Sequence, residues 1–128
     1  MGWYPQSAPL GATIAVGAEA GTDIPVTIQL QDAGEADMNT IGVVTAYLSD
    51  SAVGDGVAAA GPDGDMAIGT DGSVVVELTT ALAWILSSEA DGDIDLVFTD
   101  SAAFGPVYLV LVLGNGKKVV SGAITFAA

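Results

Sequence analysis

The sequence predicts an all-β fold, an antiparallel β-sandwich of seven to eight strands that follows an extended N-terminal arm. Two patterns support this prediction. Short segments alternate apolar and polar residues with a period of two, which is typical of strands with one buried face. Turns rich in aspartate and glycine separate these segments at short intervals. An eight-stranded barrel is the alternative arrangement of the same strands.

The arm is assigned to residues 1–11 and the sandwich domain to residues 12–128. The arm contains two aromatic side chains and two prolines and has no periodic pattern, so we expect it to be extended. The first two strands are predicted at residues 13–16 and 24–31. Pro25 stands near the start of the second strand, where a missing backbone donor is tolerated. The buried face of that strand is predicted to carry Ile24, Val26, Ile28 and Leu30.

The next strand is predicted at residues 42–49, with Val44, Ala46 and Leu48 on one face. Residues 50–65 hold glycine, alanine and aspartate without a core pattern, so we expect a long surface excursion. A short strand at 66–68 then precedes the turn Thr70–Ser73. The Asp-Gly pair of this turn, placed between apolar runs, predicts a hairpin into a strand at 74–78.

Residues 79–88 fit two structures. Leu82, Ile85 and Leu86 match a helical stripe, whereas 83–87 match a buried strand, and the strand is favoured because its neighbours are all strands. Further strands are predicted at the three segments 94–99, 107–113 and 119–126. We expect five aromatic side chains in these strands to lie in the core: Tyr47, Trp84, Phe98, Tyr108 and Phe126.

The composition argues against catalysis. The chain has no histidine, cysteine or arginine, and its cations are Lys117 and Lys118 against sixteen acids. Histidine is the commonest general acid or base near neutral pH, and a serine nucleophile needs such a base. No pair of carboxylates stands out as the acid and base of a glycosidase, and Glu77 is interpreted as a solvent-facing residue of its strand. The sequence therefore predicts no enzyme and no catalytic residue.

The charge also limits the partners. A formal net charge of −14 excludes electrostatic binding to nucleic acid or to an anionic membrane, because both need lysine or arginine contacts. The negative charge suits a protein that stays soluble and repels other copies of itself, and a high-salt habitat would explain the charge equally well. The longest apolar run, Val107–Leu113, is far too short to span a membrane. We expect a soluble protein without a secretory signal or disulfides.

Two groups of residues are candidates for binding. Asp91, Asp93 and Asp95 flank Gly92 and carry the oxygen ligands that calcium prefers, but the flanks are strands and the twelfth loop position is Ala102 rather than glutamate. Their outward position on a strand explains them without a metal, so no cofactor is expected and calcium is kept as the alternative. The arm offers candidate interface anchors, because large apolar rings often dominate contacts: Trp3, Tyr4, Pro5 and Leu10.

Four segments together resemble a family of small proteins encoded among the head genes of tailed bacteriophages and prophages. These segments are IPVTIQLQDA at 24–33, AYLSD at 46–50, SEADGDID at 88–95, and YLVLVL at 108–113 followed by VVSGAITF at 119–126. The resemblance implies an immunoglobulin-like virion component, an auxiliary or decoration protein on the capsid exterior, made in the host cytoplasm. Family members carry basic residues between strands, and this chain has almost none.

The resemblance implies no catalytic residues and makes the major capsid protein the expected partner, bound through apolar and backbone contacts. A second copy of the chain is a further partner to consider. Two alternatives remain open. One is a receptor- or glycan-binding module of a phage fibre or tail, and the other is a self-assembling acidic surface or filament subunit.

Overall fold

The computed structural model describes residues 9–127, which form ten strands and no helix. No segment among them is therefore a helix long and apolar enough to cross a membrane. The strands are β1 (Gly11–Val16), β2 (Asp23–Gln31), β3 (Val43–Ser49), β4 (Met66–Ile68), β5 (Ser73–Thr79), β6 (Ala83–Ser87), β7 (Asp93–Thr99), β8 (Phe104–Val112), β9 (Lys118–Val120) and β10 (Ile124–Phe126).

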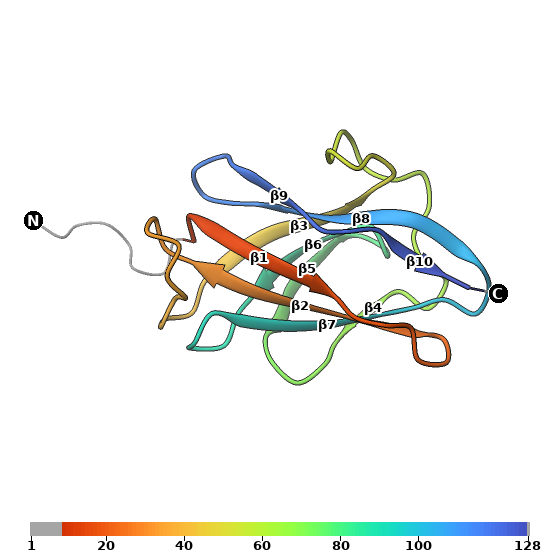
Figure 1. The fold of residues 1–128 in the computed structure, drawn as a ribbon, viewed down its shortest axis with the longest axis horizontal. Helices are drawn as coiled ribbons and strands as arrows, with labels where there is room; N and C mark the ends of the chain where they lie inside the picture. Colours follow the sequence, from red (N-terminus) through yellow and green to blue (C-terminus); the bar gives the residue numbers. More distant parts are fainter. Residues whose placement is uncertain (1–8, 128) are drawn as a thin grey trace, which may run out of the picture.

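The strands form two antiparallel sheets, which confirms the predicted all-β class (Figure 1). The four-stranded sheet has the order β1-β2-β7-β4. The six-stranded sheet has the order β10-β8-β3-β6-β5, and β9 also pairs with β8. The count of ten exceeds the predicted seven to eight partly because the segment 119–126 breaks into β9 and β10 around Ser121, whose hydroxyl accepts a bond from Leu109 N at 2.9 Å.

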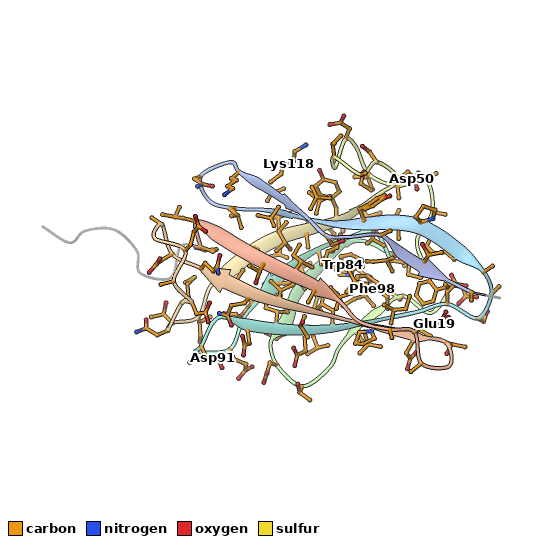
Figure 2. All side chains as sticks on the ribbon, viewed as in Figure 1. Glu19, Asp50, Trp84, Asp91, Phe98 and Lys118 are labelled. Atoms are coloured by element: carbon orange, nitrogen blue, oxygen red, sulfur yellow. The ribbon has the colours of Figure 1, made fainter. Side chains whose placement is uncertain are left out.

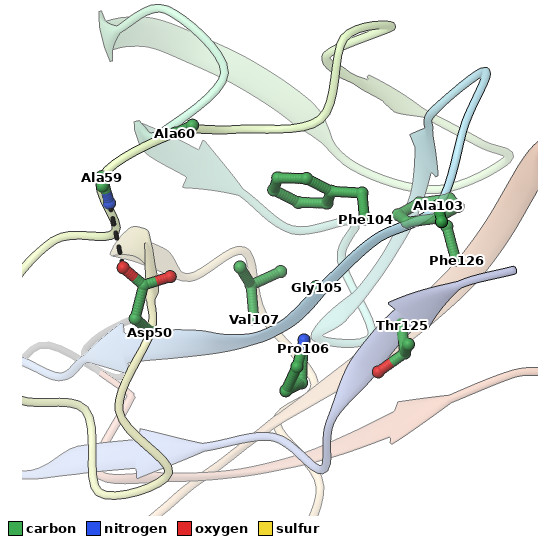
Figure 3. A pocket seen from close by; sticks show the side chains of 10 residues that line it. All are labelled: Asp50, Ala59, Ala60, Ala103, Phe104, Gly105, Pro106, Val107, Thr125 and Phe126. Carbon is green, nitrogen blue, oxygen red and sulfur yellow. Dashed lines mark hydrogen bonds between the residues drawn. The ribbon is translucent and has the colours of Figure 1, made fainter. Parts of the chain in front are cut away.

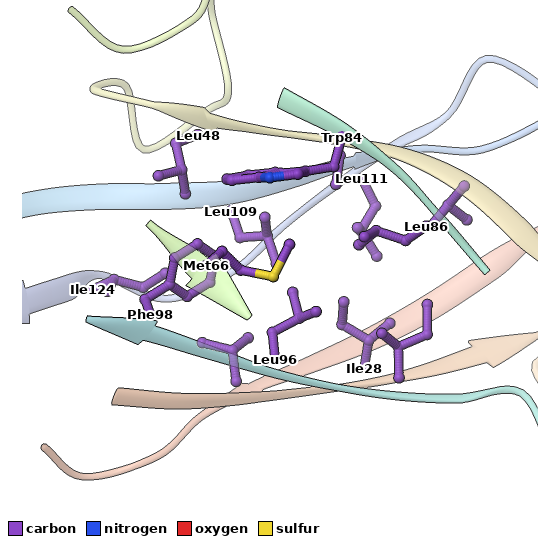
Figure 4. Packing of buried hydrophobic residues seen from close by; sticks show 14 of the residues in the cluster. Ile28, Leu48, Met66, Trp84, Leu86, Leu96, Phe98, Leu109, Leu111 and Ile124 are labelled. Carbon is purple, nitrogen blue, oxygen red and sulfur yellow. The ribbon is translucent and has the colours of Figure 1, made fainter. Parts of the chain in front are cut away.

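The core lies between the two sheets and is formed by the alternate residues that point inward (Figure 4). The predicted buried face of β2 is confirmed, since its even-numbered residues from 24 to 30 are all buried. Trp84 of β6 meets Phe98 of β7 edge-on, with ring centroids 5.9 Å apart and planes at 67°. Because these strands belong to different sheets, the pair joins the two layers, and such pairs add about 0.5–1.5 kcal/mol beyond their burial.

Residues 83–87, which fitted both a helix and a strand, form strand β6, as predicted. Trp84 and Leu86 are buried and alternate with half-buried neighbours along β6, which is the period of a strand and not of a helix. Strand β6 pairs with β3 on one side and β5 on the other, so its backbone groups are used on both sides.

The hairpin predicted at Thr70–Ser73 is wrong. Strand β4 pairs with β7 in one sheet, whereas β5 pairs with β6 in the other, so this turn crosses between sheets. Gly72 has a φ of 97°, and a Cβ there would lie 3.0 Å from the Ser87 carbonyl oxygen and 3.1 Å from Ile94 Cγ2. Gly72 is therefore needed where the chain passes from one sheet to the other close to Ser87 and Ile94, and it is not part of a two-residue hairpin.

The aromatic prediction holds for three of its five members. Trp84, Phe98 and Phe126 are buried in the core. Tyr47 and Tyr108 are instead half-buried, because they stand at outward positions of their strands. The Tyr47 hydroxyl donates to the Gly54 carbonyl at 2.6 Å, a partner that a core position would not offer.

Candidate docking surface

The outer face of the six-stranded sheet carries two rows of uncharged side chains. Side chains alternate across a strand, so the neighbours of the buried Val44, Trp84 and Leu86 point outward. The register joins these outward residues across the sheet. The first row is Val112, Thr45, Ile85 and Val76, with Lys118 paired to Val112 at its β9 end, and the second is Val120, Val110, Tyr47, Ala83 and Thr79. We call these two rows, without Lys118, the uncharged face.

No acid lies on the uncharged face. The strands of the six-stranded sheet contain only two charged residues, Glu77 and Lys118. Glu77 stands opposite Trp84, an inward residue, and its Oε2 accepts bonds from Trp84 Nε1 and Ala81 N, both at 3.0 Å. The one carboxylate of this sheet is thus bonded to a core residue at the sheet edge and does not interrupt the outer rows.

The outer face of the four-stranded sheet has the opposite character. Its register places Thr13, Gln29 and Asp93 in one row and Ala15, Thr27 and Asp95 in the next. Polar and acidic residues occupy these positions, which is usual for a solvent-facing sheet. The two outer faces of the sandwich therefore differ in charge.

The segment 50–57 covers one half of the uncharged face. Gly54 lies so close to the sheet that a Cβ would be 3.1 Å from Val110 Cγ2 and 3.2 Å from Val120 Cγ2. Tyr47 holds the Gly54 carbonyl, and Lys118 Nζ reaches the same oxygen at 3.4 Å. Lys118 also pairs with Asp55 at 3.7 Å, but both groups are exposed and the pair contributes little.

The other half of the uncharged face is open and continues into neighbouring apolar residues. Exposed fractions along β5 and at the start of β3 are 53% for Ile41, 52% for Val43, 58% for Val75, 43% for Val76 and 54% for Leu78. We call these five residues the open patch. Seven residues of β5 oppose five of β6, with irregularities between Val74 and Val76 and between Glu77 and Thr79. Such bulges disfavour strand addition at an edge, so the patch offers side chains to a partner.

A group of acids lies along the start of β7 and at the turns that precede β5 and β7, where Figure 2 labels Asp91. This acidic cluster comprises Asp71, Glu89, Asp91, Asp93 and Asp95. Partial burial raises the pKa of Asp71 and of Asp93, and repulsion from the neighbouring carboxylates raises both further. The charges of the cluster are therefore not compensated within the described chain.

Several carboxylates of the cluster accept local hydrogen bonds. Glu89 Oε2 accepts from Gly72 N at 3.0 Å, Asp91 Oδ1 accepts from Asp93 N at 3.2 Å, and Asp95 accepts from the Thr70 hydroxyl. These bonds are turn interactions of the kind aspartate commonly makes. Within residues 9–127, no three acidic side chains are grouped so that they would hold a metal ion. The calcium alternative at Asp91, Asp93 and Asp95 stays a prediction.

The arm supplied four predicted interface anchors, of which one belongs to the described residues. Trp3, Tyr4 and Pro5 lie outside the described residues. Leu10 is at the edge of β1, with 36% of its surface exposed, and its N–H donates to the Gln31 carbonyl at 3.0 Å. Leu10 and Gly11, which were predicted to belong to the arm, thus continue the four-stranded sheet.

A hollow of about 480 Å³ opens beside the start of β8 (Figure 3). Phe104, Pro106 and Val107 form part of its wall, and Asp50 Oδ2 accepts from Ala59 N at 3.1 Å on the other side. Asp50 is the one ionisable side chain among its lining residues. A single carboxylate that already holds a loop provides no acid–base pair.

Sequence reasoning missed the uncharged face, although one signal was present. The segments 43–49, 83–87 and 104–112 contain no acid in a chain that has sixteen. No family model matches the sequence, and none of the curated proteins matches it either.

Proposed function

We propose that the protein is a non-catalytic structural component of a tailed-phage virion. In this proposal it is an auxiliary, immunoglobulin-like protein that binds the capsid exterior, with the major capsid protein as its partner. The observation that carries the proposal is the uncharged face on a chain of formal net charge −14. The central part of a protein interface is depleted in charge, and this face has that composition.

The rest of the surface supports the same role. A strongly negative exterior repels other particles and keeps proteins apart, which suits the outward side of a capsid-bound protein. The absence of histidine, cysteine and arginine supports binding over chemistry. The two antiparallel sheets are compatible with the immunoglobulin-like arrangement that the family resemblance implies.

Quantitative mass spectrometry of gradient-purified virions tests this role. The protein should be present in a simple ratio to the major capsid protein, such as one to one or one to three, as lattice positions require. A host protein of similar abundance in the lysate serves as the contamination control. A few copies per particle would contradict capsid decoration and favour a tail or fibre protein, and absence from particles would contradict the virion role altogether.

A further inference from the structure

We propose that β1 pairs with β1 of a second copy of this chain, antiparallel and about a two-fold axis at Ile14, so that the two four-stranded sheets form one continuous sheet. This inference goes beyond the proposed function, because it concerns the edge of the sandwich and does not depend on binding to a capsid.

The free edge of β1 is the long, regular and uncharged sheet edge of residues 9–127. Strand β1 ends the four-stranded sheet (Figure 1), pairs with β2 along all six of its residues, and contains neither a charged residue nor proline. The other strands at sheet edges differ, since β4, β9 and β10 have three residues each and the pairing of β5 is irregular. Sheets avoid association through short edge strands, bulges, charges or proline, and β1 has none of these protections.

The backbone groups on the free side of β1 are those of Ala12, Ile14 and Val16. Gly17 N donates to the Pro25 carbonyl at 2.8 Å, and bonded pairs alternate along an antiparallel ladder, so the odd-numbered residues of β1 bond to β2. The even-numbered residues direct their N–H and C=O groups away from β2, and no strand of the described chain pairs with them there. This edge therefore matches the hydrogen-bonding pattern of an added strand.

The side chains of β1 match those that the added strand needs. Ala12, Ile14 and Val16 point inward and are half-buried, because no strand lies beyond them in their sheet. Pairing places the inward residues of an added strand beside these three, so apolar residues are needed at alternate positions. A second β1 supplies the same three inward residues, and its outward residues Thr13 and Ala15 are small and uncharged.

A two-fold axis at Ile14 uses all three backbone positions. Ile14 then lies opposite Ile14 of the second copy, and Ala12 opposite Val16, and each of these residues donates one backbone bond and accepts one. Thr13 lies opposite Ala15 in a non-bonded pair, where Cβ atoms are about 4.5–5.5 Å apart. A shift by one residue would set inward residues beside outward ones, and a shift by two would lose bonded pairs.

The charges of the two copies determine how the pairing depends on salt. Asp93 and Asp95 are two strands away from β1, so five strand spacings, about 24 Å, separate these acids from those of the second copy. That distance is about three times the Debye length of about 8 Å at 0.15 M salt. Glu19 and Asp32 are nearer, in the turns that follow β1 and β2. Repulsion therefore opposes pairing at low salt and weakens as salt rises.

Analytical ultracentrifugation of the purified full-length protein tests the pairing. A monomer–dimer equilibrium is expected, with a dissociation constant at least about tenfold lower in about 0.5 M than in about 0.05 M sodium chloride. Ala12→Pro removes an N–H on the free edge without removing a bond to β2, and should weaken dimerisation at least about tenfold. Ala12→Val keeps the N–H and should dimerise like the wild type, and circular dichroism confirms that both variants are folded.

Cysteine pairs test the register and do not depend on the proline variant. The chain contains no cysteine, so each introduced thiol is unique. A mixture of Thr13→Cys and Ala15→Cys should form a disulfide-linked heterodimer on oxidation, identified by its intact mass, in excess of the homodimer of either variant. A mixture of Thr27→Cys, one strand further back, with Ala15→Cys serves as the control and should form little heterodimer.

The outcomes separate this inference from the proposed function. A protein that stays monomeric at about 0.1 mM and 0.5 M salt, or a dimer that Ala12→Pro leaves intact and that gives no excess of the mixed disulfide, would overturn the edge pairing. Neither result bears on whether the protein is present in virions. Its absence from virions would contradict the proposed function and leave the edge pairing intact.

Discussion

The indole N–H of Trp84 donates a hydrogen bond of 3.0 Å to Glu77 Oε2, so a buried core residue is bonded to the only acid of the six-stranded sheet. The same oxygen accepts from Ala81 N at 3.0 Å, beyond the end of β5. Ala81 has a φ of 60°, an uncommon conformation for a residue with a side chain. Glu77 thus fixes the β5–β6 turn and the indole together, while the outer rows of the sheet stay free of acids.

Replacing Glu77 should destabilise the fold through these two donors. Glu77→Ala leaves Trp84 Nε1 and Ala81 N without this acceptor and should lower the free energy of unfolding, measured by urea denaturation. Glu77→Gln keeps an acceptor oxygen and should lower the free energy of unfolding by a smaller amount. In a double-mutant cycle with Trp84→Phe, which keeps a ring against Phe98, the two losses should be non-additive. Strict additivity would show that the bond does not couple the two residues.

Asp65 should make stability depend on pH. Burial raises the pKa of Asp65 above its ordinary value of 3.8, the Met66 N–H lowers it, and nearby Glu77 raises it further. The pKa of Asp65 is higher in the folded than in the unfolded protein. The contribution of Asp65 to the free energy of unfolding is therefore greatest below pH 3.8 and declines as the pH rises through the folded pKa. Asp65→Asn should therefore be more stable than wild type at pH 7, with a difference that shrinks on acidification.

Asn also tolerates the φ of 62° at position 65 and can accept the bond from Met66 N. Asp37→Asn changes the net charge equally and serves as the control. Glu77 acts in the opposite direction, because the Ala81 N–H and then Asp65 lower its pKa. Its contribution to the free energy of unfolding is therefore lost as the pH falls through the pKa of Glu77 in the folded protein. A constant difference between Asp65→Asn and wild type from pH 3 to pH 7 would refute this account.

Neutralising one acid of the acidic cluster should stabilise the protein at low salt. The pKa of Asp93 is raised by partial burial and then by Asp91, so the ionised form is disfavoured in the fold at neutral pH. Asp93→Asn should raise the melting temperature in about 0.01 M salt, and the gain should shrink toward 1 M salt as the Debye length falls from about 30 to about 3 Å.

The same melting-temperature measurement, repeated with added calcium, tests the calcium alternative. A rise in melting temperature with calcium that exceeds the rise at matched ionic strength, and that Asp93→Asn abolishes, would assign a calcium site to the cluster. A lower melting temperature of Asp93→Asn at low salt would contradict the repulsion described here.

Substitutions on the two faces of β3 should have different consequences. Leu48 is fully buried between the sheets, and Leu48→Ala should cost about 2–5 kcal/mol of unfolding free energy through a cavity. Val43 is half exposed in the open patch, and Val43→Ala should change stability by no more than about 0.5 kcal/mol. Chemical denaturation measures both, and a large loss for Val43→Ala would mean that the patch supports the fold.

The strands could be predicted because their period is local. Alternation in 24–31 and 42–49 identified the inward residues, and the strands predicted on either side of 83–87 favoured a strand there. The sheet to which a strand belongs could not be predicted in the same way. The Asp-Gly turn at residues 71–72 has the composition of a hairpin, but its position between the sheets depends on pairing with β6 and β7, which lie later in the chain.

The candidate surface depended on the same long-range information. Each row of the uncharged face draws residues from at least four strands, so the row does not exist in the sequence order. Glu77 is exposed, as predicted, but its hydrogen bond to Trp84 could not be predicted, because nothing near Glu77 in sequence indicates that Trp84 lies opposite. The acidic cluster was partly predictable, since Asp91, Asp93 and Asp95 are close in sequence, whereas Asp71 joins them only through the fold.

Hydroxyl-radical footprinting of capsid-bound protein, read by mass spectrometry, tests the docking account most directly. Free protein and protein on capsids are labelled under the same conditions, and the modification of each side chain is compared. The account predicts protection of Val43, Val76 and Leu78 on capsids, with unchanged modification at Thr13 and Thr27 on the other sheet. Unchanged modification of the patch, with protection of the four-stranded sheet instead, would contradict it.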